Sequence, residues 1–421
     1  MKRHGAVAVV GAGIGGLTAA LCLHARGIDV ELYESVSDIR PLGVGINLLP
    51  HAIQVLAGLG LLDELTQLGI ETQSLCYFNK LGQLIWQEPR GVAAGLPYPQ
   101  ISIHRGELQM LLLRAVEARL GQGVIHNDCT VTAVANDGEH ATLTYQGPVG
   151  PRQARAAVIV AADGIHSRVR RQFYPDEGMP IWNGAILWRG LTPTAPFLGG
   201  RTMIMAGHQK QKFVAYPVDR TAFEAGASMT NWIAELRFEP TELMQREDWN
   251  RSGDFNEFAP KFADWRFPWL DVPALIASAD VCYEFPMVDR NPVDRWSYGR
   301  VTLLGDAAHP MYPIGSNGAS QAILDAQTLA AAMADHADTA AALRAYEAKR
   351  LPATAAIVKA NRGNGPEQVM QLAEERAPHG FDDIDEFIPL AERQAIAAQY
   401  QQIAGFDKQS RESARAGEVS S

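Results

Sequence analysis

The chain has 421 residues, of which 47% are hydrophobic, so it is long enough to bury a substantial core as two domains or as one domain with an insertion. The formal net charge is −10 and the acidic residues are spread along the chain, which argues against nucleic acid as a partner. Four cysteines lie far apart without a C-x-x-C pair, so we expect no metal site, no redox dithiol and no disulfide framework. A reducing cytoplasm fits this cysteine pattern best.

The amino terminus carries Lys2 and Arg3 before an apolar run, which superficially resembles a signal peptide. The glycines that follow lie where a phosphate-binding turn requires them, so we favour a folded strand at this position. No other run approaches the ~20 apolar residues that a membrane-spanning helix needs. We therefore expect no membrane association.

The first motif is Gly11-Ala12-Gly13-Ile14-Gly15-Gly16, which lies between an apolar run at 6–10 and a helix expected over 17–26. A GxGxxG turn at the start of a helix presents backbone N–H groups to a pyrophosphate. Glu34 ends the next apolar run, where a carboxylate accepts hydrogen bonds from an adenosine ribose. This unit predicts a dinucleotide site.

Further elements follow in chain order. A glycine-rich loop over 41–48 suits close approach of backbone to a flat ligand, and helices are expected over 50–59 and 105–120. Strands are expected over 124–134, 142–145 and 156–162, the last of which ends at Asp163. The interval from about 181 to 284 predicts a mostly antiparallel sheet with a helical part near 241–278, and it holds six of the eight tryptophans.

The last third of the chain begins with a strand expected over 301–304 that leads to Gly305 and Asp306. Helices are expected over 318–336 and 339–361, and Pro352 would kink or divide the second helix. Residues beyond 407 are polar, so we expect a frayed tail.

Three motifs in this order resemble those of the class A flavoprotein monooxygenases, the single-component FAD-dependent aromatic hydroxylases, over about residues 5–365. Beside the GxGxxG unit with Glu34, the resemblance rests on ADGIHSRVR at 162–170 and on GDAAHP at 305–310. Shorter stretches at 40–47, 102–110, 188–190 and 286–290 resemble the 5-methylphenazine-1-carboxylate 1-monooxygenase branch.

The resemblance implies an α/β fold with a glutathione-reductase-type (Rossmann-like) FAD-binding domain and an inserted, mostly antiparallel β-sheet substrate domain, known as the PHBH-like fold. On this basis we assign residues 1–75, 100–180 and 281–365 to a discontinuous FAD-binding domain. Residues 76–99 and 181–280 form the substrate-binding sheet domain, and residues 366–421 form a C-terminal helical segment with a frayed tail.

By the same resemblance, Glu34 binds the adenosine ribose, Arg105 reaches the pyrophosphate, and Asp306 accepts hydrogen bonds from the ribityl chain. The N–H groups at Gly318 and Ala319 would face flavin N1 and O2, where they would stabilise negative charge on the reduced ring. The expected FAD contacts are Gly11, Gly13, Ile14, Gly15, Gly16, Glu34, Val44, Gly45, Asn47, Arg105, Val131, Asp163, Gly305, Asp306, Pro313, Gly318 and Ala319.

One position departs from the family pattern. Many of these hydroxylases have glycine three residues after the proline that follows the GD motif, whereas this chain has Ser316 there and Gly315 one place earlier. The phenazine-type branch shares the displaced glycine, so we interpret it as a subfamily feature.

The activity implied is hydroxylation of a planar aromatic or N-heteroaromatic substrate, including phenazine-like ones, with NAD(P)H and O₂ through a flavin C4a-hydroperoxide. No second GxGxxG unit is present, so NAD(P)H would bind transiently in a shared groove. The flavin carries the chemistry, so no catalytic side chain is assigned, and apolar walls would exclude water. Aromatic and methionine residues on strands are more often core, but the substrate contacts we expect are Trp188, Met203, Met205, Tyr216, Tyr312 and Pro313.

Two alternatives remain open from the sequence: a flavin oxidase or dehydrogenase on the same scaffold, and a non-catalytic FAD-fold binding protein. A flavin-dependent halogenase is disfavoured, because the segment 265–269 does not match the paired-tryptophan motif of those enzymes. His309 is expected to pack or cap its turn, and Asp289-Arg290 to form a structural ion pair. A monomer or homodimer is expected.

Overall fold

The computed structural model describes residues 6–238, 252–363 and 365–403. The amino-terminal apolar run forms β1 (Val7–Val10) in the middle of a six-stranded sheet of order β20-β21-β12-β1-β2-β8. All pairs in this sheet are parallel except β20 with β21. Every residue of β1 is buried, as expected for a strand that is covered on both faces. The other strands are β2 (Val30–Tyr33), β8 (Ile125–His126), β12 (Val158–Ala161), β20 (Ser297–Tyr298) and β21 (Val301–Leu303).

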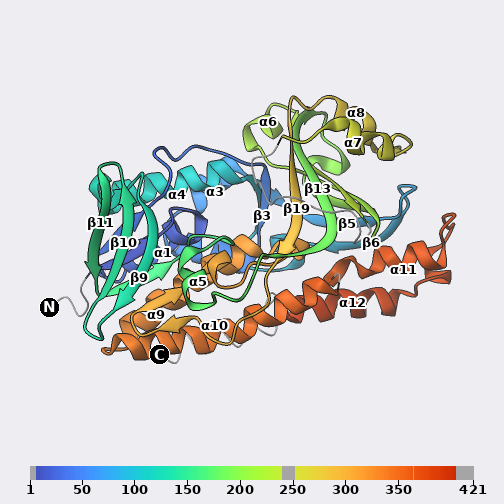
Figure 1. Cartoon of the computed structure of the whole chain (residues 1–421). Helices are drawn as coiled ribbons and strands as arrows, with labels where there is room; N and C mark the ends of the chain where they lie inside the picture. Colours follow the sequence, from blue (N-terminus) through green and yellow to red (C-terminus); the bar gives the residue numbers. More distant parts are fainter. Residues whose placement is uncertain (1–5, 239–251, 364, 404–421) are drawn as a thin grey trace.

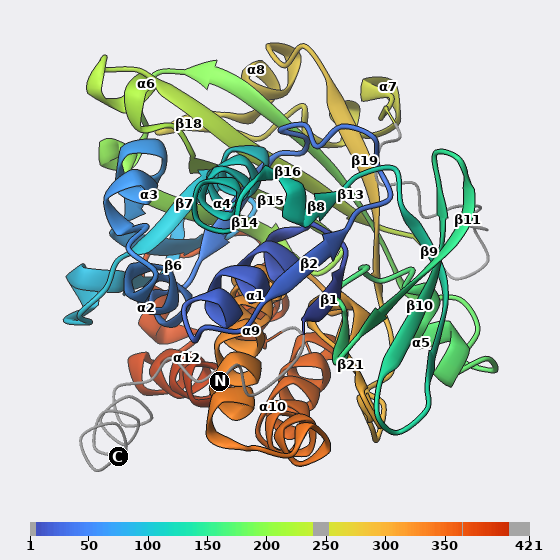
Figure 2. The ribbon, with the colours of Figure 1, turned by 90° about the vertical axis from the view of Figure 1, so that its left-hand side faces the viewer.

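Helices cover this sheet and place the glycine turn. α1 (Ile14–His24) packs between α4 and α9, and α10 packs on the far side of α9 (Figure 2). Leu17, Leu21 and Leu23 of α1 are completely or almost completely buried in the core that these helices share. The helices of this half are α2 (Pro50–Gly58), α3 (Leu62–Leu68), α4 (Arg105–Leu120), α5 (Arg168–Phe173), α9 (Gly318–Asp335) and α10 (Thr339–Arg362).

Two small antiparallel sheets flank the six-stranded sheet. One has the order β11-β10-β9, and the other has the order β3-β7-β4. Their strands are β9 (Thr130–Asn136), β10 (Ala141–Gly147), β11 (Gly150–Ala156), β3 (Gly45–Leu48), β7 (Gln100–His104) and β4 (Ile70–Thr72).

A seven-stranded sheet of order β19-β13-β16-β15-β14-β5-β6 forms the second half of the molecule (Figure 1). Its pairs are antiparallel except β14 with β5, which are parallel. One face carries α7 (Phe255–Phe258), the hairpin β17 (Arg266–Phe267) and β18 (Leu270–Asp271), and α8 (Val272–Ala277). The sheet strands are β5 (Ser74–Phe78), β6 (Leu84–Pro89), β13 (Ile181–Thr194), β14 (Thr202–His208), β15 (Gln211–Pro217), β16 (Ser228–Arg237) and β19 (Cys282–Asp289).

The C-terminal helices lie against the other face of this sheet. α11 (Gln368–Arg376) packs on β5, β6 and β14, and α12 (Leu390–Ile403) packs against α10 and α11 (Figure 1). α6 (Arg220–Glu224) connects β15 to β16. Among the helices of the described ranges, none combines the length and the apolar composition that crossing a bilayer demands.

The expected helices over 50–59, 105–120, 318–336 and 339–361 are confirmed to within one residue, and Pro352 lies inside α10 without ending it. The expected strand over 124–134 is wrong as one element, because β8 and β9 belong to different sheets and Asp128 between them adopts a φ of 54°. Likewise, the chain from 150 to 161 forms β11 and β12, which Ala157 separates. Part of the expected helical stretch near 241–278 and the expected frayed tail lie outside the described residues.

The seven-stranded sheet begins and ends slightly outside the segments assigned to it from the sequence. β5 starts at Ser74, and β19, which occupies 282–289, lies at the edge of this sheet rather than in the six-stranded sheet. The predicted FAD-domain segment 281–365 therefore starts with a strand of the other sheet.

Candidate functional site

The glycine turn joins β1 to α1, and two of its glycines lie directly against backbone carbonyl oxygens. Gly11 has a φ of 96°, and a Cβ atom there would lie 2.6 Å from the carbonyl oxygen of Ala162. At Gly16 a Cβ would lie 1.9 Å from the carbonyl oxygen of Gly11, whereas at Gly13 it would meet nothing within 4 Å. The first and last glycines thus close the turn against protein, while Gly13 borders open space.

A cleft of about 360 Å³ adjoins this turn. Its lining includes five of the predicted FAD contacts, from four separate segments: Gly11, Gly13, Glu34, Val131 and Asp163. The Glu34 carboxylate accepts hydrogen bonds from the N–H groups of Ala12 at 2.7 Å and Val36 at 3.0 Å, so it is fixed at the mouth of the turn. A cleft of this size, with the Glu34 carboxylate fixed beside the glycine turn, suits the adenosine part of a nucleotide.

Arg105 and Asp306 lie within electrostatic reach of each other. Arg105 begins α4, and Asp306 follows β21 in the short 3₁₀ turn Gly305–Ala307. Both residues expose surface. Desolvation by the surrounding protein nevertheless raises the pKa of Asp306 and lowers the pKa of Arg105, and the charge of each opposes the shift of the other.

The glycine-rich loop is tied to the seven-stranded sheet at Gly45. The carbonyl oxygen of Gly45 accepts hydrogen bonds from the Tyr216 hydroxyl at 2.8 Å and from Arg189 Nη2 at 2.6 Å, and its N–H donates to Asn231 Oδ1 at 2.7 Å. Nearby, Asn47 is buried and accepts a hydrogen bond from the Ser102 hydroxyl at 2.5 Å. Tyr216, predicted as a substrate contact, therefore holds this loop.

The turn before α9 adopts an uncommon backbone conformation. Gly315 has a φ of 68° and Ser316 a φ of 59°, so the serine occupies the left-handed region that favours glycine. α9 begins at Gly318, and Asn317 provides no side-chain cap to the described part of this helix. The first N–H groups of α9, at Gly318 and Ala319, are therefore suited to an acceptor from outside the helix.

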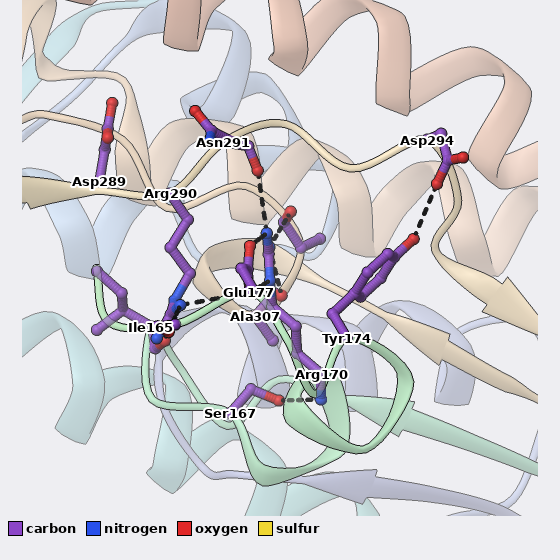
Figure 3. A network of polar contacts seen from close by, with 12 residues as sticks. Ile165, Ser167, Arg170, Tyr174, Glu177, Asp289, Arg290, Asn291, Asp294 and Ala307 are labelled. Carbon is purple, nitrogen blue, oxygen red and sulfur yellow. Dashed lines mark hydrogen bonds and ion pairs between the residues drawn. The ribbon is translucent and has the colours of Figure 1, made fainter. Parts of the chain in front are cut away.

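Arg170 connects the second and third motifs, as Figure 3 shows. Its guanidinium is buried and donates to the carbonyl oxygens of Ala307 at 3.1 Å and Ala308 at 2.7 Å. The Glu177 carboxylate accepts from Arg170 Nε at 2.8 Å and also pairs with Arg290 at 3.3 Å. This network fixes the turn that carries Asp306 relative to the segment that carries Asp163.

The expected ion pair between Asp289 and Arg290 is wrong. The two side chains point away from each other (Figure 3). Asp289 is fully buried and accepts two hydrogen bonds from Arg362 at 2.7 and 2.8 Å, whereas Arg290 joins Glu177. Neighbouring residues on an extended chain face opposite sides, which is why they serve two networks.

His309 contacts Asp325, and Asp325 in turn binds the backbone of the turn that holds Gly305 and Asp306. Its Nε2 lies 2.5 Å from Asp325 Oδ2, and Asp325 also accepts from Arg350 Nε at 2.7 Å and from the Gly305 N–H at 3.1 Å. Burial raises the pKa of Asp325, but the charges of His309 and Arg350 outweigh burial and lower that pKa to about 2. The sequence singled out His309 but gave no signal for Asp325, which lies on an alanine-rich helix.

The predicted substrate contacts are divided between two faces of the seven-stranded sheet. Met203, Met205 and Tyr216 belong to the buried cluster on the α11 side. Trp188 instead lies in the cluster on the α7 side, where its ring stacks on Phe258 with centroids 4.9 Å apart. Trp188 thus lies on the opposite face of the sheet from Met203, Met205 and Tyr216, and its contact with a substrate stays a prediction.

The remaining predicted contacts lie at the edge of the GD loop. Tyr312 is buried and Pro313 is exposed. A hollow between Met203, Met205 and the Gly315–Ser316 turn measures about 10 Å³, which is room for about one water molecule. An aromatic ring therefore does not fit this hollow as it stands.

The residues present fit FAD: a GxGxxG turn, an acidic residue after the second strand, and an arginine that interacts electrostatically with a carboxylate. Together with the two-sheet architecture, they define an FAD-binding α/β protein with the PHBH-like fold. The chain belongs to the FAD_binding_3 family, whose FAD binding domain model matches residues 4–246 and 280–361.

Relatives with named activities match most of the chain. A phenazine 1,6-dicarboxylic acid hydroxylase from Lysobacter antibioticus is 47% identical over 365 residues, which cover 85% of this chain and 89% of that protein. A 3-amino-4-hydroxybenzoate 2-monooxygenase from Streptomyces platensis is 32% identical, with coverage of 86% and 88%. The structure of a single-substitution variant of Klebsiella pneumoniae HpxO complexed with FAD superimposes with a TM-score of 0.71 at 25% identity, over 95% of this chain and 94% of that one. The chain is thus an FAD-dependent monooxygenase of aromatic small molecules.

Proposed function

We propose that this enzyme hydroxylates a planar N-heteroaromatic carboxylic acid, with NAD(P)H as the electron donor. The observation that carries the proposal is that Arg105 lies within electrostatic reach of Asp306, whose turn packs against α9, while Tyr216 of the substrate-side sheet holds the glycine-rich loop and Glu34 lines the cleft at the glycine turn. The identity to a phenazine 1,6-dicarboxylic acid hydroxylase supports the substrate class.

Each FAD-binding residue has a role that its surroundings support. Glu34 accepts hydrogen bonds from ribose hydroxyls, Arg105 neutralises the pyrophosphate, and Asp306 accepts from ribityl hydroxyls. The N–H groups of Gly318 and Ala319 stabilise negative charge at the pyrimidine edge of the flavin. When bound, FAD supplies hydride acceptance and oxygen activation, and the buried faces around it exclude water.

Arg189 is the arginine that we assign to the carboxylate of the substrate. It extends from β13 toward the glycine-rich loop, opposite in direction to Trp188, and its guanidinium lies 5.6 Å from the centre of the Phe285 ring. Burial lowers the pKa of Arg189. Within the described chain no carboxylate forms an ion pair with it, so an anionic group of a ligand would supply the missing countercharge.

The test is oxygen incorporation by the FAD-loaded enzyme. Phenazine-1,6-dicarboxylate is expected to accelerate NAD(P)H oxidation and to yield product labelled by ¹⁸O₂, whereas its dimethyl ester gives little acceleration. Arg189→Gln should raise the KM for the acid much more than for the ester. Flavin reduction by the compound itself without NAD(P)H, and product without label, would instead indicate an oxidase or dehydrogenase.

We also propose a cytoplasmic location and a monomeric or homodimeric state. All four cysteines are free and buried, which fits a reducing compartment. Light scattering coupled to size exclusion distinguishes the two states of assembly.

A further inference from the structure

The side chain of Tyr400, on the C-terminal helix α12, packs against the loop that precedes α9. The side chain is 4% exposed. Its hydroxyl lies 3.2 Å from the carbonyl oxygen of Ile314 and 2.9 Å from Asn361 Oδ1, and it accepts a hydrogen bond from Asn317 Nδ2 at 2.8 Å. A hydroxyl has one proton, so the two oxygen acceptors share it while Asn317 donates to the hydroxyl oxygen.

Asn361 extends the same support to the start of the loop. Its Nδ2 donates to the carbonyl oxygen of Tyr312 at 3.0 Å, while its Oδ1 faces Tyr400. Two side chains, from α10 and α12, therefore hold the loop at Tyr312, Ile314 and Asn317. The last of these residues directly precedes the first turn of α9.

The loop conformation needs such support. Gly315 and Ser316 both lie in the left-handed region, with φ values of 68° and 59°, and a non-glycine residue persists there when its surroundings fix it. A Cβ atom at Gly315 would lie 1.9 Å from the Tyr400 hydroxyl oxygen. The ring of Tyr400 thus requires glycine at 315, which gives a physical reason for the glycine displaced from position 316.

We infer that Tyr400 is a positioning residue for the flavin, acting through the loop that sets the N–H groups of Gly318 and Ala319. The inference rests on the proposed function, because it takes the flavin to lie beside the start of α9. Tyr400 lies beyond residue 361, where the match to the FAD binding domain model ends, so the role belongs to the C-terminal segment of this chain.

The experiment compares Tyr400→Phe, which keeps the ring and removes the hydroxyl, with Arg393→Met. Arg393 also lies on α12 but binds the Ile85 carbonyl oxygen at 2.8 Å and Asp385, away from the loop. Hydrogen exchange of residues 312–320 in the apoprotein reports on the loop, and FAD titration with the visible flavin spectrum reports on the cofactor.

Tyr400→Phe is expected to speed exchange over 312–320, to weaken FAD binding roughly 5- to 10-fold for the lost hydrogen bonds, and to shift the flavin absorption bands. Arg393→Met should leave all three unchanged. Equal effects of the two variants, or unchanged exchange in Tyr400→Phe, would overturn the inference. Faster exchange with unchanged FAD affinity and spectrum would instead reject the flavin placement, and with it this role of Tyr400.

Discussion

Asp325 offers the sharpest test of how the GD turn is supported. This fully buried carboxylate accepts hydrogen bonds from Gly305, His309 and Arg350, and the arginine is itself only 7% exposed. The substitution Asp325→Asn keeps the shape of the side chain but removes its charge. It also turns an NH₂ donor toward groups that are themselves donors.

The expected loss of stability in Asp325→Asn follows because the buried guanidinium of Arg350 loses its carboxylate partner. Removing one member of a buried ion pair destabilises a protein by about 3–5 kcal/mol. At roughly 2 °C of melting temperature per kcal/mol for a large domain, the apoprotein of Asp325→Asn should melt about 6–10 °C below wild type. Glu392→Gln is a matched control, because it breaks an exposed ion pair with Arg376 and should leave the melting temperature unchanged.

The assay is differential scanning fluorimetry of both apoproteins as a function of pH. The pKa of Asp325 is lowered to about 2, below its ordinary value of 3.8. Its stabilising contribution is therefore present above about pH 4 and is lost as the pH falls toward 2. The difference between wild type and Asp325→Asn should shrink over that window. A variant that melts like wild type at pH 7 would refute this account of the turn.

Three further predictions concern the FAD site and its support. Asp306→Ala should weaken FAD binding by about 1.5–3 kcal/mol, or roughly 10- to 150-fold in Kd, by titration of the apoprotein, and unchanged affinity would reject the assigned contact. Glu177→Gln removes the carboxylate that two buried arginines share and should destabilise the fold by about 3–5 kcal/mol in urea titrations; a loss below ~1 kcal/mol would mean that the pair is dispensable. Gly16→Ala should abolish FAD retention and lower the melting temperature, because its Cβ would lie 1.9 Å from a carbonyl oxygen. Gly13→Ala should instead weaken FAD binding while the apoprotein melts like wild type, and the reverse order would contradict the geometry of the turn.

The sequence predicted the parts of the site that local patterns encode. The GxGxxG turn and Glu34 follow from a strand, a turn and a helix that are close in the chain, and they line one cleft in the structure. Four helices were predicted to within one residue for the same reason, because capping and apolar periodicity act over a few residues, whereas α1 begins at Ile14, three residues before the expected start.

Contacts between distant segments escaped sequence reasoning. Asn231, Asp325 and Tyr400 carry no motif, and each acts on a segment outside its own helix or strand. The face on which Trp188 lies could not be predicted, because helices cover one face of the seven-stranded sheet and α11 covers the other, so both faces are apolar and alternation does not reveal direction. Successive side chains on a strand point to opposite faces of the sheet, so an error of one residue in the predicted position assigns a side chain to the wrong face.

The parallel pairing of β5 with β14 has a consequence for synthesis on the ribosome. β5 ends at Phe78 and its partner begins at Thr202, so at roughly 5–20 residues per second the earlier strand waits on the order of ten seconds for its neighbour. Only β6 can protect one edge of β5 during that time. The nascent chain therefore presents an open strand edge while the residues between β5 and β14 are synthesised, and slower synthesis of this interval would prolong the exposure of that edge to misassembly.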